Sequence, residues 1–204
     1  QLSDVDKSAF SNINEDVIVY VKANTPAMYR VIELELPFEL YNNTKLEDAV
    51  VNPNSGYYMT TNKVKQGEHN TFVIDYSCDA ERFSEITEPE ICVYIPNSMN
   101  LNTSFIQMDD TYLESGNYVL DKKDRILRIP VSKASGTIKL SLKATGTGKI
   151  ISYAALQYHK GQDIFNEAVG TIMMDVPSLS LNCSDQVADG NISISGCATA
   201  LEEV

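Results

Sequence analysis

Apolar and polar residues alternate along most of the chain, and this period of two predicts β-strands. In TIKLSLKA (137–144), Ile138, Leu140 and Leu142 would face a core, while Lys139, Ser141 and Lys143 would face water. Valine, isoleucine, threonine and tyrosine suit a pleated surface and are concentrated in such runs. The predicted strands are 16–22, 29–36, 57–64, 71–77, 90–96, 125–131, 137–144, 149–159, 170–176, 179–183 and 191–196.

Turn-forming residues separate these predicted strands at short intervals. Glycine, proline, asparagine and aspartate cluster in segments such as 52–56, 121–124 and 145–148. Many short strands joined by turns are typical of a β-sandwich, and helix signals are few. The pattern therefore predicts an all-β protein built around a β-sandwich.

Two turn-rich segments, 52–56 and 176–180, look like junctions between units. We predict a small N-terminal β-subdomain over residues 1–56 and a β-sandwich over residues 57–177. Residues 178–204 would form a C-terminal β-hairpin or the start of a following module. Because the chain opens at Gln1 without a methionine, we expect a piece of a longer protein, monomeric as it stands.

Composition and charge narrow the classes of partner. With 43% hydrophobic and 22% charged residues, the chain can bury a substantial core. Its 16 basic and 28 acidic residues give a formal net charge of −12, which would repel nucleic acid and anionic lipid. No apolar run approaches the roughly 20 residues that span a bilayer, so we expect no membrane insertion.

The four cysteines form two pairs with the same spacing, since Cys78 and Cys92 are 14 positions apart and so are Cys183 and Cys197. This spacing is unlike the closely spaced ligands of a structural zinc site, and no C-x-x-C redox motif occurs. An even count in strand context favours two disulfides, Cys78–Cys92 and Cys183–Cys197. Each would close a loop of about 15 residues and contribute about 3 kcal/mol. Four buried free thiols are the alternative.

The sequence offers no catalytic constellation. Its two histidines, His69 in a turn and His159 at a strand end, lack a neighbouring nucleophile motif. Adjacent carboxylates such as Asp109-Asp110 point to opposite faces of a strand, whereas glycosidase chemistry needs two carboxyls facing each other. We therefore expect no enzyme, with no catalytic residue, cofactor or metal. The chain also lacks tryptophan, which counts against a carbohydrate-binding platform.

The middle of the chain resembles the Ig-like repeats of large surface proteins of Gram-positive, gut-commensal-type bacteria. Gly67 matches their first turn, Ile95-Pro96 their hydrophobic-proline position, and Ala144–Gly148 their late turn. The closing PSLSLNCSDQVADGNISISGCATA is similar to the entry into a following repeat. The resemblance implies an Ig-like β-sandwich in a secreted or cell-surface protein that acts as an adhesin, a host-protein binder or a stalk.

Tyrosine and methionine, which are favoured in recognition surfaces, mark a candidate binding site. The segment 97–117 would be a long loop of mixed polarity, and eleven tyrosines are spread over the chain. The candidate protein-binding residues are Met99, Phe105, Met108, Tyr112, Tyr57 and Tyr58. Core packing is the competing interpretation for each residue taken singly.

These observations favour an extracellular, non-catalytic binding module that engages a host protein or host glycoprotein. By analogy with commensal surface proteins of this type, immunoglobulin is the first candidate ligand. The alternatives are a structural stalk or spacer domain of an adhesin, and a carbohydrate-binding accessory domain of a secreted enzyme.

Overall fold

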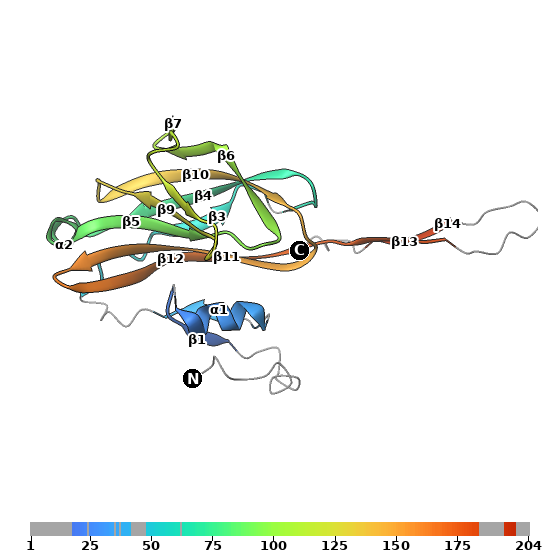
Figure 1. The fold of residues 1–204 in the computed structure, drawn as a ribbon, viewed down its shortest axis with the longest axis horizontal. Helices are drawn as coiled ribbons and strands as arrows, with labels where there is room; N and C mark the ends of the chain where they lie inside the picture. The colour runs from blue at the N-terminus through green and yellow to red at the C-terminus, as the bar shows by residue number, and fades with distance from the viewer. Residues whose placement is uncertain are drawn as a thin grey trace, which may run out of the picture.

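Two five-stranded antiparallel sheets face each other in the computed structural model (Figure 1). The structure describes residues 18–23, 25–34, 36, 38–41, 48–61, 63–183 and 194–198. Sheet I has the order β3-β4-β10-β6-β7 and sheet II the order β12-β11-β5-β9-β8. Sheet I contains β3 (Gly56–Met59), β4 (His69–Ser77), β6 (Met99–Met108), β7 (Thr111–Tyr112) and β10 (Ser135–Ala144). Sheet II contains β5 (Thr87–Tyr94), β8 (Val119–Asp121), β9 (Ile126–Pro130), β11 (Gly148–Lys160) and β12 (Asp163–Val176).

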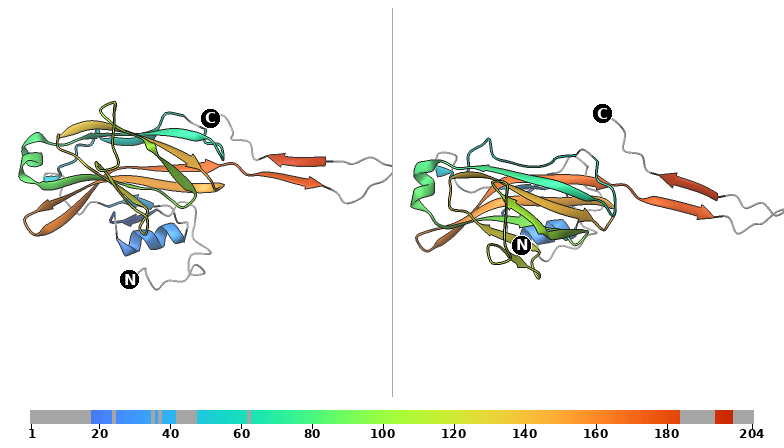
Figure 2. Two further views of the ribbon diagram at one scale, coloured as in Figure 1. Left: turned by 45° about the horizontal axis from the view of Figure 1, so that its top comes forward. Right: turned by 90° about the horizontal axis from the view of Figure 1, so that it is seen from above.

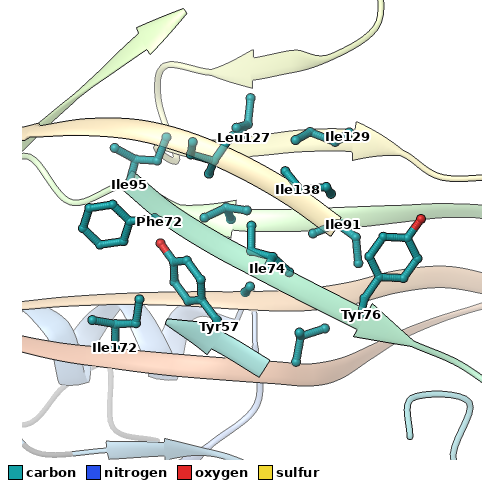
Figure 3. Packing of buried hydrophobic residues seen from close by; sticks show 14 of the residues in the cluster. Tyr57, Phe72, Ile74, Tyr76, Ile91, Ile95, Leu127, Ile129, Ile138 and Ile172 are labelled. Atoms are coloured by element: carbon teal, nitrogen blue, oxygen red, sulfur yellow. The ribbon is translucent and has the colours of Figure 1, made fainter. Parts of the chain in front are cut away.

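The main core lies between the inner faces of the two sheets, as the alternation predicts. Ile138, Leu140 and Leu142 of β10 are fully buried, and each lies opposite a residue of β4 in the antiparallel register. Phe72 and Ile74 of β4 join the same cluster. Figure 3 shows these side chains meeting those of sheet II, where Ile91, Leu127 and Ile129 are labelled. The predicted all-β sandwich is therefore confirmed.

Sheet II is buried on its outer face as well. In β5, Ile91 and Val93 belong to the main core, whereas Tyr94 belongs to a second cluster on the opposite face. This second cluster joins sheet II to an N-terminal unit, which consists of β1 (Val19–Val21), α1 (Pro26–Glu33) and β2 (Phe38–Leu40). β1 and β2 are parallel. Figure 1 and the left view of Figure 2 show α1 beside β11 and β12, on the side of sheet II away from sheet I.

The helix α1 corrects the strand predicted over residues 29–36. Thr25 caps the helix because its Oγ1 accepts a hydrogen bond from the Met28 amide at 3.3 Å, and Pro26 occupies the first turn. Met28, Val31 and Ile32 then recur at helical spacing and pack against sheet II. The cap and the proline outweigh the short apparent alternation that follows them.

Two further elements complete the described structure. The short helix α2 (Ala80–Glu85) connects β4 to β5, with Asp79 as its N-cap. The strands β13 (Leu179–Cys183) and β14 (Ile194–Ala198) form the predicted C-terminal hairpin, which extends away from the sandwich in Figures 1 and 2. Residues 48–55 pack on the sandwich through Val50, so the three-unit division at residues 56 and 177 stays a prediction.

We predict that Met28→Ala lowers the free energy of unfolding by about 3 kcal/mol, because Met28 is fully buried between α1 and sheet II. The measurement is urea unfolding of the two proteins. The control is Glu33→Ala, which changes an exposed residue of the same helix. An equal loss in both variants would contradict the packing described for α1.

Candidate functional site

The outer face of sheet I is the candidate binding surface. Because side chains alternate along each strand, one residue from every strand meets in a single row across this face. The register places Tyr58 opposite Val73, Val73 opposite Lys139, Lys139 opposite Gln107, and Gln107 opposite Tyr112. The row therefore has a tyrosine on each edge strand, and four inter-strand spacings place the two tyrosine backbones roughly 19 Å apart.

Three of the six predicted binding residues lie on this outer face. Tyr58 and Tyr112 are 46% and 57% exposed. Phe105 shares the face with Gln107, two positions along β6, and its ring meets that of Tyr112 edge-on, with centroids 5.7 Å apart and an interplanar angle of 82°. An edge-to-face pair restrains both rings, so Tyr112 is held in place by its neighbour.

The other three predicted residues point into the sandwich, so their role in a binding surface stays a prediction that this geometry does not favour. Tyr57 and Met99 are buried in the main core, and Met108 is partly buried against it. The Tyr57 hydroxyl lies 2.9 Å from Ser152 Oγ, so its polar atom is paired inside the core. In Figure 3 the Tyr57 ring lies beside Phe72 and Ile172. These residues were grouped with the exposed ones because they are close to them in sequence. The alternation of side chains along a strand places the two sets on opposite faces.

The predicted loop over 97–117 is largely a β-hairpin. β6 and β7 pair antiparallel, with Met108 opposite Thr111, so the turn consists of Asp109 and Asp110. These two residues have φ values of 48° and 62°, the left-handed region that a two-residue hairpin turn of type I′ requires. Aspartate tolerates this region better than most residues, which explains a turn without glycine.

Hydrogen bonds fix the position of Tyr58. Asp75 on β4 accepts a hydrogen bond from the Tyr58 hydroxyl at 2.6 Å and another from Thr137 Oγ1 at 2.7 Å. The bond to Asp75 raises the pKa of Tyr58, because ionisation would place two negative oxygens side by side. The phenol therefore stays neutral and keeps its ring over the outer face at neutral pH.

Ion pairs and hydrogen bonds fix the turn on the Tyr112 side in the same way. Asp109 Oδ2 lies 2.8 Å from Lys133 Nζ, and Asp109 Oδ1 accepts a hydrogen bond from the Thr137 amide at 3.1 Å. These hydrogen bonds lower the pKa of Asp109. Lys139 Nζ lies 2.6 Å from Asp110 Oδ1. The turn is thus tied to β10 by both of its carboxylates.

Sequence reasoning missed the residues that support the tyrosines, namely Asp75, Thr137 and Lys139. Their role depends on which strands become neighbours, since β4 and β10 are 62 positions apart at the Asp75–Thr137 contact. The available signal was the alternation itself, which assigns these residues to outward positions of β4 and β10. The pairing of the two strands cannot be read from that signal.

Cys78 and Cys92 are free thiols in the structure, which corrects the predicted bridge between them. Cys78 belongs to the main core, whereas Cys92 alternates with Ile91 and Val93 and so faces the other side of sheet II. The two sulfurs therefore lie on opposite sides of sheet II, although the equal spacing of the cysteine pairs in the sequence favoured a bridge. Burial raises the pKa of each thiol to about 12, so both are protonated at neutral pH.

The second predicted bridge involves residues whose side chains lie outside the described part of the structure. The backbone register pairs Cys183 with Ile194 and Cys197 with Ser180. The two cysteines are thus offset by three positions, roughly 10 Å along the strands, which exceeds the Cα separation of a disulfide. The Cys183–Cys197 bridge stays a prediction that this register does not favour.

The two histidines have ordinary polar neighbours. His69 Nδ1 lies 3.1 Å from Ser141 Oγ on the outer face of sheet I, and His159 Nε2 lies 3.6 Å from Glu88 Oε2. Within the described ranges, no three His, Cys, Asp or Glu side chains are grouped to hold a metal ion. In the same part of the chain, no helix has the length and apolar character needed to cross a membrane.

We predict that Lys133→Ala raises the pKa of Asp109 toward its ordinary value of 3.8, because the strongest hydrogen bond to the carboxylate is lost. A lowered pKa means that the ion pair stabilises the hairpin above pH 3.8 and that this contribution disappears as the pH falls through the folded-state pKa. NMR titration of the Asp109 carboxyl measures the shift. Lys139→Ala is the control, since Lys139 pairs with Asp110, and an equal shift there would contradict the assignment.

The comparisons with known proteins show a shared fold. No protein-family model matches the chain, and no curated protein matches its sequence. Domains D2 and D3 of SpaD, a major pilin of Corynebacterium diphtheriae, match with a TM-score of 0.50 and 9% identity over 68% of this chain and 58% of theirs. Full-length SpaD matches with a TM-score of 0.50 and 8% identity over 78% of this chain and 40% of its own.

BcpA, the major pilin subunit of Bacillus cereus, is a further similar structure, with a TM-score of 0.46 and 7% identity over 79% of this chain and 55% of its own. The chain thus spans 58% or less of the length of each of these pilin structures. At these identities the likeness to SpaD shows the fold alone, an Ig-like β-sandwich of the kind found in Gram-positive surface pilins.

Proposed function

We propose that the chain is a non-catalytic, extracellular module of a bacterial surface protein of pilin or adhesin type, and that it binds a host protein through the outer face of sheet I. The observation that carries this proposal is the pair of exposed tyrosines, Tyr58 and Tyr112, at the two edges of one cross-strand row. Tyrosine is enriched among residues that dominate binding energy, because its ring offers a large contact area and a hydrogen-bonding hydroxyl.

Preorganisation of these rings supports the proposal. Asp75 holds the Tyr58 hydroxyl, and Phe105 packs edge-on against Tyr112. A side chain that is already fixed loses less conformational entropy on binding, so more of its contact energy appears as affinity. Lys139 and Gln107 lie between the tyrosines and would supply hydrogen bonds at the centre of the interface.

Immunoglobulin is the first host protein that we propose to test, and a host glycoprotein is the next. This choice rests on the resemblance to commensal surface proteins, while the chemistry of the face sets only the class of partner. A sheet face of mixed polar and aromatic side chains suits another protein surface better than it suits a small molecule, which prefers a concave pocket.

A stalk or spacer role is the second candidate, and the shared fold with a major pilin favours it. In that role the module would separate neighbouring domains and retain no host protein. A carbohydrate-binding role would also use the exposed tyrosines, and a glycan array tests it directly.

We predict that the immobilised protein retains immunoglobulin from serum and mucus, and that the double variant Tyr58→Ala/Tyr112→Ala weakens this binding at least tenfold. Loss of two aromatic anchors at one interface commonly costs this much. The matched control is Tyr20→Ala/Tyr41→Ala, because these tyrosines of the N-terminal unit are 62% and 53% exposed. Equal weakening by the control variant would indicate that the outer face of sheet I is not the binding site. If the protein retains no serum or mucus protein, the result would favour the stalk role.

A further inference from the structure

The segment Ala49–Asn52, here named the strap, runs along the edge of the sandwich just before β3. Val51 forms an antiparallel bridge with Cys78, and the Asn52 amide donates to the Ser77 carbonyl at 2.8 Å. The Asp79 amide donates to the Val50 carbonyl at 2.9 Å. The strap is therefore tied by backbone hydrogen bonds to the segment that follows β4.

A single carboxylate holds the strap from inside the core. Glu167 of β12 is fully buried, and its Oε2 accepts hydrogen bonds from the amides of Val50 at 2.9 Å and Val51 at 2.8 Å. Its Oε1 accepts a hydrogen bond from the Tyr158 hydroxyl at 2.7 Å. All three donors are uncharged, and two of them belong to the strap.

Burying a carboxylate is costly, and its retention here calls for a compensating role. An apolar residue at position 167 would fill the same space without desolvating a charge, but it would leave two adjacent amides of the strap without an acceptor. Hydrogen bonds to an ionised acceptor are also stronger than neutral ones. The carboxylate is thus suited to fixing one particular segment of backbone.

The contact between Glu167 and the strap matters because the strap lies over Cys78. Cys78 pairs with Val51, is only 7% exposed, and shares the main core with Val50. Cys78 also lies close enough to Glu167 and Tyr158 to interact with both electrostatically. If the strap leaves its place, this thiol and the edge of the core beside it meet solvent.

We propose that Glu167 is a latch, whose carboxylate keeps the strap closed over Cys78 and thereby couples the chain segment before β3 to the sandwich. Opening the latch releases the strap as a unit, while the two sheets stay paired. This device does not depend on the binding function proposed for the outer face of sheet I, because Glu167, Val50 and Cys78 are buried in the interior.

The test is Glu167→Gln, which keeps the shape of the side chain and removes its charge and one acceptor oxygen. We expect amide hydrogen exchange at Val50 and Val51 to accelerate at least tenfold, with unchanged exchange at Ile138 and Leu140 in β10. Maleimide labelling of Cys78, mapped by mass spectrometry, should accelerate by a similar factor, with Cys92 as the internal control on the other face of sheet II. Removing a neighbouring charge also changes thiol ionisation, so the amides are the primary measurement.

Two further variants test whether the effect requires Glu167 or follows from the loss of any contact to the strap. Arg82 Nη1 donates to the Ala49 carbonyl at 2.9 Å but is not bonded to Glu167, so Arg82→Ala should change exchange at Val50 and Val51 less than twofold. Tyr158→Phe removes one donor while keeping the carboxylate, and should accelerate the strap amides locally if Glu167→Gln does not fold. Unchanged strap exchange in both Glu167→Gln and Tyr158→Phe, or equal acceleration throughout β10, would overturn the latch.

Discussion

The burial of sheet II on both faces is the constraint on which the rest of the structure depends. Its strands carry continuous apolar runs, such as Ile91 to Tyr94 in β5, and such runs cannot leave one face in water. The main core covers one face and the N-terminal unit covers the other. Tyr94 and Tyr153 stack with centroids 5.7 Å apart at this second interface. Sheet I, by contrast, keeps the alternation of a sheet with one face in water, and that face carries the exposed Tyr58 and Tyr112.

Alternation in the sequence was sufficient to predict the sandwich. In a strand such as β10, the large residues that face the core are apolar and the residues between them are polar. It failed at α1, where the alternation of apolar and polar residues over 32–36 mimics a short strand and the decisive signal is the Thr25-Pro26 cap that precedes it. It also failed over β6, where Thr103 and Ser104 are exposed, small and polar and therefore look like a loop. Over β6, tertiary packing decided a segment whose local pattern supports more than one structure.

The candidate site could be predicted only in part, because aromatic content identifies residue types and the strand period identifies faces. Tyr57 and Tyr58 are neighbours in sequence, yet one enters the core and the other reaches solvent. The same period turns Cys92 away from the main core, which contains Cys78. The supporting residues Asp75 and Thr137 come together through the pairing of β4 with β10, which is a property of the whole topology. The face to which each residue of a strand points can therefore be predicted from the sequence once the register is known. Which distant strands pair with each other cannot be predicted in this way.

Acidic residues stabilise this structure as hydrogen-bond acceptors both at the surface and in the core. At the surface, Asp75 and Asp109 accept from side chains and a backbone amide, and solvent screens the charge that remains. In the core, Glu167 performs the same function without solvent, so each of its three donors matters more. The surface carboxylates hold a tyrosine hydroxyl and a turn, and the buried one accepts from two adjacent backbone amides of the strap. The difference in depth thus separates carboxylates that position a tyrosine and a turn on the outer face of sheet I from a carboxylate that holds a segment of backbone against the core.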